Sequence, residues 1–196
     1  MSFKPKVRLI QILLLLISLS CGSSKKKTFD FGAFEITGPK NWNVVKVQGI
    51  DSYVRMVITK SNDTLHFDYG YYSNPLEEKG IFVHSSNSIP WFIENDIDTT
   101  GFHFIEKDTI TSEDRLVFLK QETTFELIDG FKAKIVSPKN TGEGLTGVYF
   151  DSLGSGPIGN FKLNFVGYNL DIETEEELLI AIRTMQFEKQ LSTSDK

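Results

Sequence analysis

Apolar and polar residues alternate along much of the chain after Phe29, which is the pattern of half-buried β-strands. The alternation is clearest from Ile50 to Thr59, and it returns from Leu65 to Tyr72 after the turn-forming Ser61-Asn62-Asp63. Shorter stretches with strand character are predicted at 29–36, 42–47, 103–110, 115–121, 145–150 and 161–167.

The strongest local signal is a hairpin centred on Asp129-Gly130. Glu122–Ile128 and Phe131–Val136 flank these two residues, and Asp-Gly suits the tight turn whose twist matches paired strands. We therefore expect consecutive strands of this chain to pair antiparallel.

Two segments have helical spacing instead. Ser88 precedes Pro90 as an N-cap, and apolar residues follow at 89, 92, 93 and 97. Near the end of the chain, Thr174-x-x-Glu177 fits a capping box, and an apolar stripe follows at Leu178, Ala181, Ile182 and Met185. Strands with few helices predict an α+β fold, a single domain with a large, mainly antiparallel sheet flanked by helices and a C-terminal amphipathic helix.

The first twenty residues have a different pattern. Three basic residues precede the short apolar run Leu9–Ile17, which is followed by Ser18-Leu19-Ser20 and the single cysteine, Cys21. The run is shorter than the roughly 20 apolar residues of a membrane-spanning helix. Residues 1–20 are therefore interpreted as a signal peptide.

This segment resembles a bacterial lipoprotein precursor of the Bacteroidota kind. The resemblance implies that Cys21 becomes a lipid-modified N-terminus and that the membrane is a partner through this lipid. Ser18 and Ser20 also suit ordinary signal peptidase, which would leave Cys21 unlipidated. Residues 21–28 are then a tether, and the lack of an acidic run after Cys21 favours the periplasmic side of the envelope over the cell surface.

Length and charge narrow the class of protein. Removing residues 1–20 leaves 176 residues with 18 Lys and Arg against 26 Asp and Glu, a net charge near −8. Nucleic-acid binders usually carry the opposite balance, so nucleic acid is excluded as a partner. One folded domain over 29–188, with a polar tail at 189–196, accounts for the length.

Short motifs resemble those of the PsbP-like fold group, named for an extrinsic photosystem subunit. The opening Phe34–Trp42 has the group's Pro-x-x-Trp arrangement, and the end Thr184-Met185-Gln186-Phe187 resembles its closing helix and strand. Gly49–Tyr53 and Phe67–Ser73 also resemble uncharacterised Bacteroidota lipoproteins. The resemblance implies a sheet flanked by helices, and no activity follows from it because the fold hosts unrelated functions.

An aromatic sheet face is the candidate binding site. Asp51, Tyr53 and Arg55 share one face of their strand, and Phe67, Tyr69 and Tyr71 share one face of the next. Tyr53, Arg55, Tyr69 and Tyr71 are therefore candidate ligand-binding residues for a sugar, peptide or aromatic ligand. The competing interpretation, which we favour, is that these aromatics pack beneath a helix.

Catalytic motifs are weak. His66, His84 and His103 lie on separate elements, so neither a metal nor another cofactor is predicted. The glycine-rich loops at 141–147 and 154–159 lack the P-loop lysine, and no serine has a Ser-x-Gly elbow. We therefore expect a binding or accessory module of the envelope, with an envelope protein as a possible partner, rather than an enzyme. An enzyme of unfamiliar type, using Asp51, Asp68 and His66, is the remaining alternative.

Overall fold

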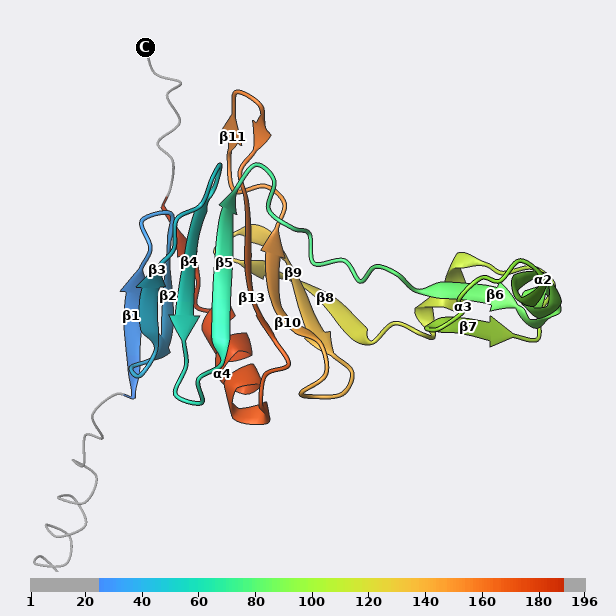
Figure 1. Cartoon of the computed structure of the whole chain (residues 1–196). Coiled ribbons are helices and arrows are strands. Elements are labelled where there is room, and N and C mark those ends of the chain that lie inside the picture. Colours follow the sequence, from blue (N-terminus) through green and yellow to red (C-terminus); the bar gives the residue numbers. More distant parts are fainter. Residues whose placement is uncertain (1–24, 189–196) are drawn as a thin grey trace, which may run out of the picture.

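The computed structural model describes residues 25–188 (Figure 1). The predicted signal segment, Cys21 and the polar tail at 189–196 lie outside these residues. None of the helices within 25–188 has the length and hydrophobicity that a bilayer-spanning helix requires.

A seven-stranded antiparallel sheet forms the body of the molecule. This finding confirms the predicted α+β class with a large antiparallel sheet and few helices. In spatial order the strands are β3 (Asn43–Lys46), β4 (Tyr53–Ile58), β5 (Thr64–Gly70), β13 (Lys162–Tyr168), β10 (Leu145–Phe150), β9 (Phe131–Pro138) and β8 (Gln121–Ile128).

The predicted Asp129-Gly130 hairpin is confirmed at one edge of this sheet. Ile128 pairs with Phe131, and the two residues between them have φ angles of +48° and +84°. Positive φ at both central residues is what a type I′ turn requires, and Gly adopts it without steric cost. The turn therefore fixes the register of β8 against β9.

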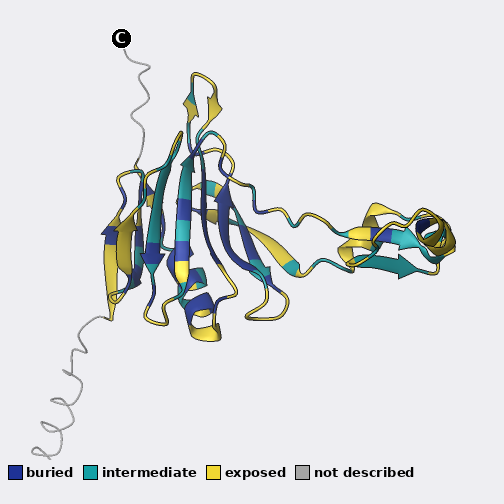
Figure 2. Cartoon of the chain, in the orientation of Figure 1, coloured by how far each residue is buried: buried dark blue, intermediate teal, exposed yellow. Residues whose placement is uncertain are grey.

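One face of the large sheet is covered by a second layer. This layer contains α4 (Ile172–Ile182) and a small sheet of β1 (Lys26–Asp30), β2 (Phe34–Pro39) and β14 (Gln186–Phe187). The core between the layers is rich in phenylalanine and appears as the dark strands in Figure 2. Its fully buried phenylalanines are Phe34, Phe67, Phe150 and Phe165.

The N-cap of helix α4 lies three residues before the predicted N-cap, Thr174. This N-cap is Asp171, whose Oδ1 accepts a hydrogen bond from the Thr174 amide at 2.7 Å. A capping box at Thr174 is therefore wrong, because an aspartate one turn earlier caps the helix and its charge suits the helix dipole. The Thr174 hydroxyl is buried and contacts Ser61 Oγ at 2.8 Å.

A lobe formed by residues 81–119 stands apart from the sheet (Figure 1). It contains the parallel strands β6 (Phe82–Ser85) and β7 (Phe102–Ile105), the short helices η1 (Ser86–Ser88) and α2 (Ile89–Glu94), and α3 (Ser112–Leu116). The strand predicted at 103–110 ends at Ile105. A strand over 115–121 is wrong, because Thr111 and Asp114 form a capping box that starts α3.

Candidate functional site

The second face of the large sheet, here called the open face, is crossed by one segment of chain. This strap, residues 73–78, runs from the end of β5 toward β8 and the lobe (Figure 1). Its first residue is fixed by the Ser73 hydroxyl, which donates to the backbone carbonyls of Asp68 at 2.8 Å and Lys162 at 3.2 Å.

Side chains of the sheet hold the middle of the strap. Asn164 Nδ2 donates to the Asn74 carbonyl at 3.2 Å, and Lys134 Nζ donates to the carbonyls of Pro75 at 3.0 Å and Leu76 at 3.4 Å. These donors satisfy strap carbonyls that have no sheet partner. The strap is therefore part of the folded body and not a loose connection.

Leu76 anchors the strap by packing. It is buried and has a φ of +55°, a left-handed conformation that is uncommon for a leucine. The Leu76 amide donates to Asn74 Oδ1 at 2.9 Å, which supports this turn. A small apolar cluster on the open face compensates the backbone cost, and its other members are Val136, Leu145, Tyr149 and Val166.

The strap ends at the base of the lobe in a side-chain clasp. The Glu78 carboxylate accepts hydrogen bonds from the backbone amides of Lys120 at 2.9 Å and Gln121 at 3.1 Å. These amides lie where the chain returns from the lobe into β8. Glu78 therefore ties the two connecting segments of the lobe together.

Two hollows lie on the open face and share the side chain of Lys134. Together we call them the open-face groove. The first, of about 270 Å³, lies against the strap and is lined by Leu76, Glu77, Glu78, Leu119, Gln121, Thr123 and Lys134. The second, of about 320 Å³, is lined by Phe125, Lys132, Lys134, Tyr149, Asp151 and Ser152.

An aromatic ring and a cation form the outer end of the groove. Phe125 is 60% exposed although it lies on a strand, and Lys132 Nζ is 4.7 Å from its ring centroid. Exposed aromatic rings beside charged groups are features of ligand-binding surfaces.

A hydrogen-bonded pair lies at the inner end. The Tyr149 hydroxyl donates to Asp151 Oδ1 at 2.8 Å. Burial raises the pKa of the Tyr149 hydroxyl above its ordinary value, and the Asp151 carboxylate raises it further. Tyr149 therefore stays protonated. The second hollow thus presents one carboxylate, a phenol, a serine hydroxyl and two ammonium groups beside the Phe125 ring, and the first hollow adds the carboxylates of Glu77 and Glu78.

The remainder of the open face includes His66 on β5. Its ring stacks on Tyr168 at a centroid distance of 5.8 Å, and it pairs across the sheet with Met56 and Val166. Burial lowers the pKa of His66, while the nearby Asp68 carboxylate opposes this shift.

The aromatic row predicted from the sequence as a ligand-binding site lies on the opposite, core-facing side of the sheet. Its residues are Tyr53, Arg55, Tyr69 and Tyr71. Tyr53 pairs directly with Tyr69, and the Arg55 guanidinium lies 4.2 Å from the Tyr53 ring centroid. The Phe161 ring stacks on both Tyr69 and Tyr71.

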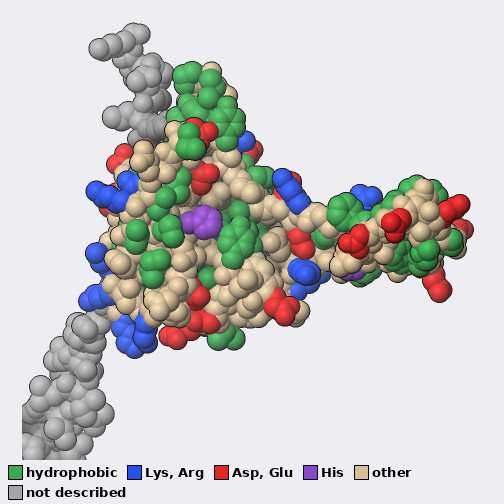
Figure 3. Space-filling view, viewed as in Figure 1, with side chains coloured by type: hydrophobic (Ala, Val, Ile, Leu, Met, Phe, Trp, Pro, Cys, Tyr) green, Lys and Arg blue, Asp and Glu red, His purple; other side chains and the backbone are tan. Residues whose placement is uncertain are grey.

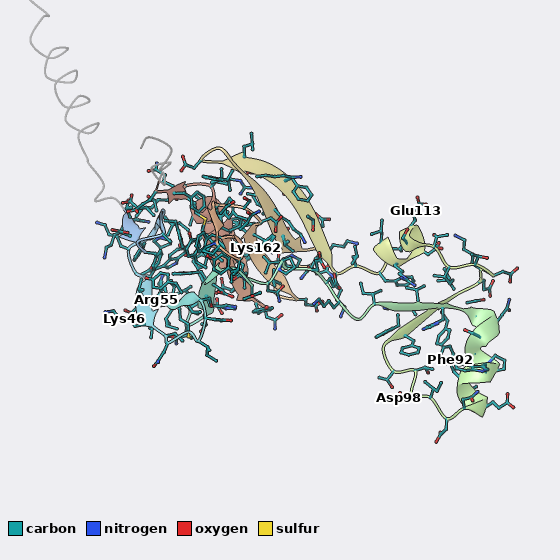
Figure 4. All side chains as sticks on the ribbon, turned by 90° about the horizontal axis from the view of Figure 1, so that it is seen from above. Lys46, Arg55, Phe92, Asp98, Glu113 and Lys162 are labelled. Atoms are coloured by element: carbon teal, nitrogen blue, oxygen red, sulfur yellow. The ribbon has the colours of Figure 1, made fainter. Side chains whose placement is uncertain are left out.

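This row is half-buried along the margin of the core. Tyr53 and Tyr69 pack against the core cluster, and the Arg55 guanidinium donates to the backbone carbonyls of Val54 and Val47. Arg55 lies beside Lys46 at the β3 edge (Figure 4). The row is thus one contiguous aromatic strip whose only cation is already hydrogen-bonded to the backbone.

The suspected catalytic residues do not form one cluster. His66 and Asp68 are two residues apart on β5, where they pair with Met56 and Val54, so the His66 and Asp68 side chains share the open face. Asp51 lies in the loop before β4. Between residues 25 and 188, no group of three His, Cys, Asp or Glu side chains is placed to hold a metal ion.

The groove residues could not be selected from the sequence pattern. Phe125 and Lys134 belong to strands that were predicted, but nothing in the sequence indicates that residues 73–78 cross that face. The Asp129-Gly130 turn is the one usable signal, because it fixes which residues of β8 and β9 face the same side.

Comparison with known proteins does not name the site. The chain matches no known protein family. It also has no detectable relative among curated proteins.

Proposed function

We propose that this protein is an exported, lipid-anchored envelope protein that binds a glycan in the open-face groove. The signal-like segment and Cys21 support the export and the anchor. The periplasmic side is the proposed location. Binding rather than catalysis is proposed because the groove gathers an exposed aromatic ring and convergent polar groups.

A PsbP-like fold is proposed for the body. Its two resembling motifs come together at one place: β2, which opens with Phe34, pairs with β14, which contains Phe187. The ring of Trp42 is buried in the same core. This juxtaposition supports a shared architecture and carries no activity.

The observation that carries the ligand proposal is the exposed ring of Phe125 at the outer end of the groove, in a hollow whose other lining residues are polar or charged. A sugar ring offers an apolar face to an aromatic ring and hydroxyl groups to its surroundings. In the hollow beside Phe125, Asp151 and Ser152 supply hydrogen-bonding partners. The two lysines there, Lys132 and Lys134, outnumber its one carboxylate and favour a sugar that carries a carboxylate. Acidic glycans are therefore the proposed class.

A glycan array tests this proposal. The full-length protein should bind a subset of acidic glycans, and Phe125→Ala should abolish those signals. Tyr72→Ala is the matched control, because Tyr72 is an exposed aromatic residue that does not line the groove. Equal binding by both variants, or no glycan bound by the wild type, would overturn the proposal.

An accessory role without a small ligand is the second candidate. It is favoured by a different observation, the exposed apolar side chains of the lobe.

A further inference from the structure

The helix α2 exposes most of its apolar side chains. Residues 89, 92 and 93 of the helix, with Ile97 just after it, have the spacing that usually faces a core, yet only Phe92 is buried. Ile93 is 75% exposed and Trp91 is 55% exposed. Figure 4 shows Phe92 on α2 and Asp98 in the turn that follows it.

The helix itself is firmly closed, so the exposure is not a frayed end. The amides of Asp96 and Ile97 donate to the carbonyls of Ile93 and Phe92 at 3.2 Å and 3.0 Å. This is the Schellman arrangement, with Asp96 in the left-handed conformation at a φ of +51°. Phe92 packs against His84, Phe102 and Phe104 within the lobe.

The exposed apolar surface has an acidic rim. Glu94, Asp96 and Asp98 follow one another on α2 and its turn, and all three are exposed. The sequence contains no Lys or Arg between Ser85 and Glu106. Apolar and acidic side chains cover the outer end of the lobe in Figure 3.

This combination excludes an anionic lipid surface as the natural occupant, because the rim would be repelled by it. It fits a protein surface with an apolar pocket and a basic border. The position of α2 at the end of the lobe farthest from the sheet leaves it accessible to such a partner (Figure 1).

We propose that α2 and its following turn, with Ile89, Trp91, Ile93 and Ile97 at the centre and Glu94, Asp96 and Asp98 at the rim, dock a basic protein partner. The site is separate from the open-face groove and does not depend on glycan binding. The exposed isoleucine and tryptophan side chains provide the desolvated centre, and the carboxylates set the orientation of the partner.

Site-specific photocrosslinking tests this proposal in the cells that produce the protein. A photoreactive residue at position 93 of the full-length chain should yield one discrete adduct with a different protein. The same residue at position 158 is the control, because Ile158 is 66% exposed on the β11–β12 hairpin (Ser155–Gly156 and Gly159–Asn160). Adducts with lipid or with a second copy, equal adducts at both positions, or no adduct at 93 would overturn the proposal.

Direct binding of the purified partner then tests the chemistry. Ile93→Ser should weaken binding by on the order of tenfold or more, whereas Ile158→Ser should not. Glu94→Gln should weaken binding and reduce its salt dependence, whereas Glu113→Gln, on α3 of the same lobe, should do neither. Loss of binding by the control variants, or full binding by Ile93→Ser, contradicts the assigned surface.

Discussion

The Glu78 carboxylate accepts two hydrogen bonds from the backbone amide of Lys120, at 2.9 and 3.1 Å, across the base of the lobe. This contact joins the segment that leaves the sheet to the segment that returns to it. It therefore sets how firmly the lobe is held at its base.

Removing this clasp should loosen the base of the lobe without unfolding the sheet. In Glu78→Ala the amides of Lys120 and Gln121 lose a charged acceptor, so their hydrogen exchange should accelerate by about tenfold or more. Hydrogen-exchange mass spectrometry of peptides over 118–122 measures this change. Glu77→Ala is the control, because Glu77 is the exposed neighbour on the strap, and equal acceleration in both variants would argue against the clasp.

The packing of the strap is tested at Leu76. Leu76→Ala removes a buried side chain from the apolar cluster on the open face. We expect this variant to lose about 2 kcal/mol in the free energy of unfolding. Urea denaturation measures the loss. Leu127→Ala, at a residue that is 76% exposed, should change stability by less than about 0.5 kcal/mol. If the strap did not pack against the sheet, the two variants would have the same free energy of unfolding.

The open face should make stability depend on pH through His66. Burial lowers the pKa of folded His66 below its ordinary 6.5, so the unfolded chain binds this proton more readily than the folded chain does. The free energy of unfolding contributed by His66 is thus fully present above about pH 6.5 and is lost as pH falls through and below that value.

Comparison with His66→Gln isolates this contribution, because other groups titrate alike in both proteins. Denaturation at several pH values from 8 to 5 should show a flatter profile in the variant. Asp68→Asn should steepen the wild-type profile, since the Asp68 carboxylate favours protonated His66. A variant as pH-dependent as the wild type would rule out His66 as the source.

The glycine that precedes the Pro-x-x-Trp motif, Gly38, has a steric role. A Cβ at Gly38 would lie 2.6 Å from ring atoms of Trp42, which is buried in the core. Gly38→Ala should displace the ring, lower stability by about 1–3 kcal/mol and shift the tryptophan emission to longer wavelength, read in a Trp91→Phe background. Trp42→Phe should reduce the cost of Gly38→Ala in a double-mutant cycle, and strictly additive effects would contradict the contact.

Local sequence signals were sufficient to predict features that depend on neighbouring residues alone, such as a turn or the position of a strand. The Asp129-Gly130 turn needs positive φ at two residues, and that requirement is visible in the sequence itself. The alternation around Val57 and Leu65 likewise identified two strands that pair in the structure.

The way in which the elements pack against one another could not be predicted from these local signals. The spacing of Ile89, Phe92 and Ile93 indicates a buried stripe, but the lobe stands away from the sheet and leaves two of the three exposed. Tyr53 and Tyr69 pair and pack against the core, in line with the favoured interpretation of these aromatics. No local pattern specifies that the covering layer contains a small sheet as well as a helix. The groove depends on the strap, whose path is set by long-range contacts such as Lys134 to Pro75.

The most direct test of the proposed function is calorimetric titration of an acidic oligosaccharide selected on the array into the full-length protein. Phe125→Ala, in the groove, and Tyr71→Ala, in the sequence-predicted aromatic row, are measured side by side. We expect Phe125→Ala to raise the dissociation constant by on the order of tenfold or more and Tyr71→Ala to leave it unchanged. The reverse pattern would place the ligand on the aromatic row and contradict the assignment of the open face.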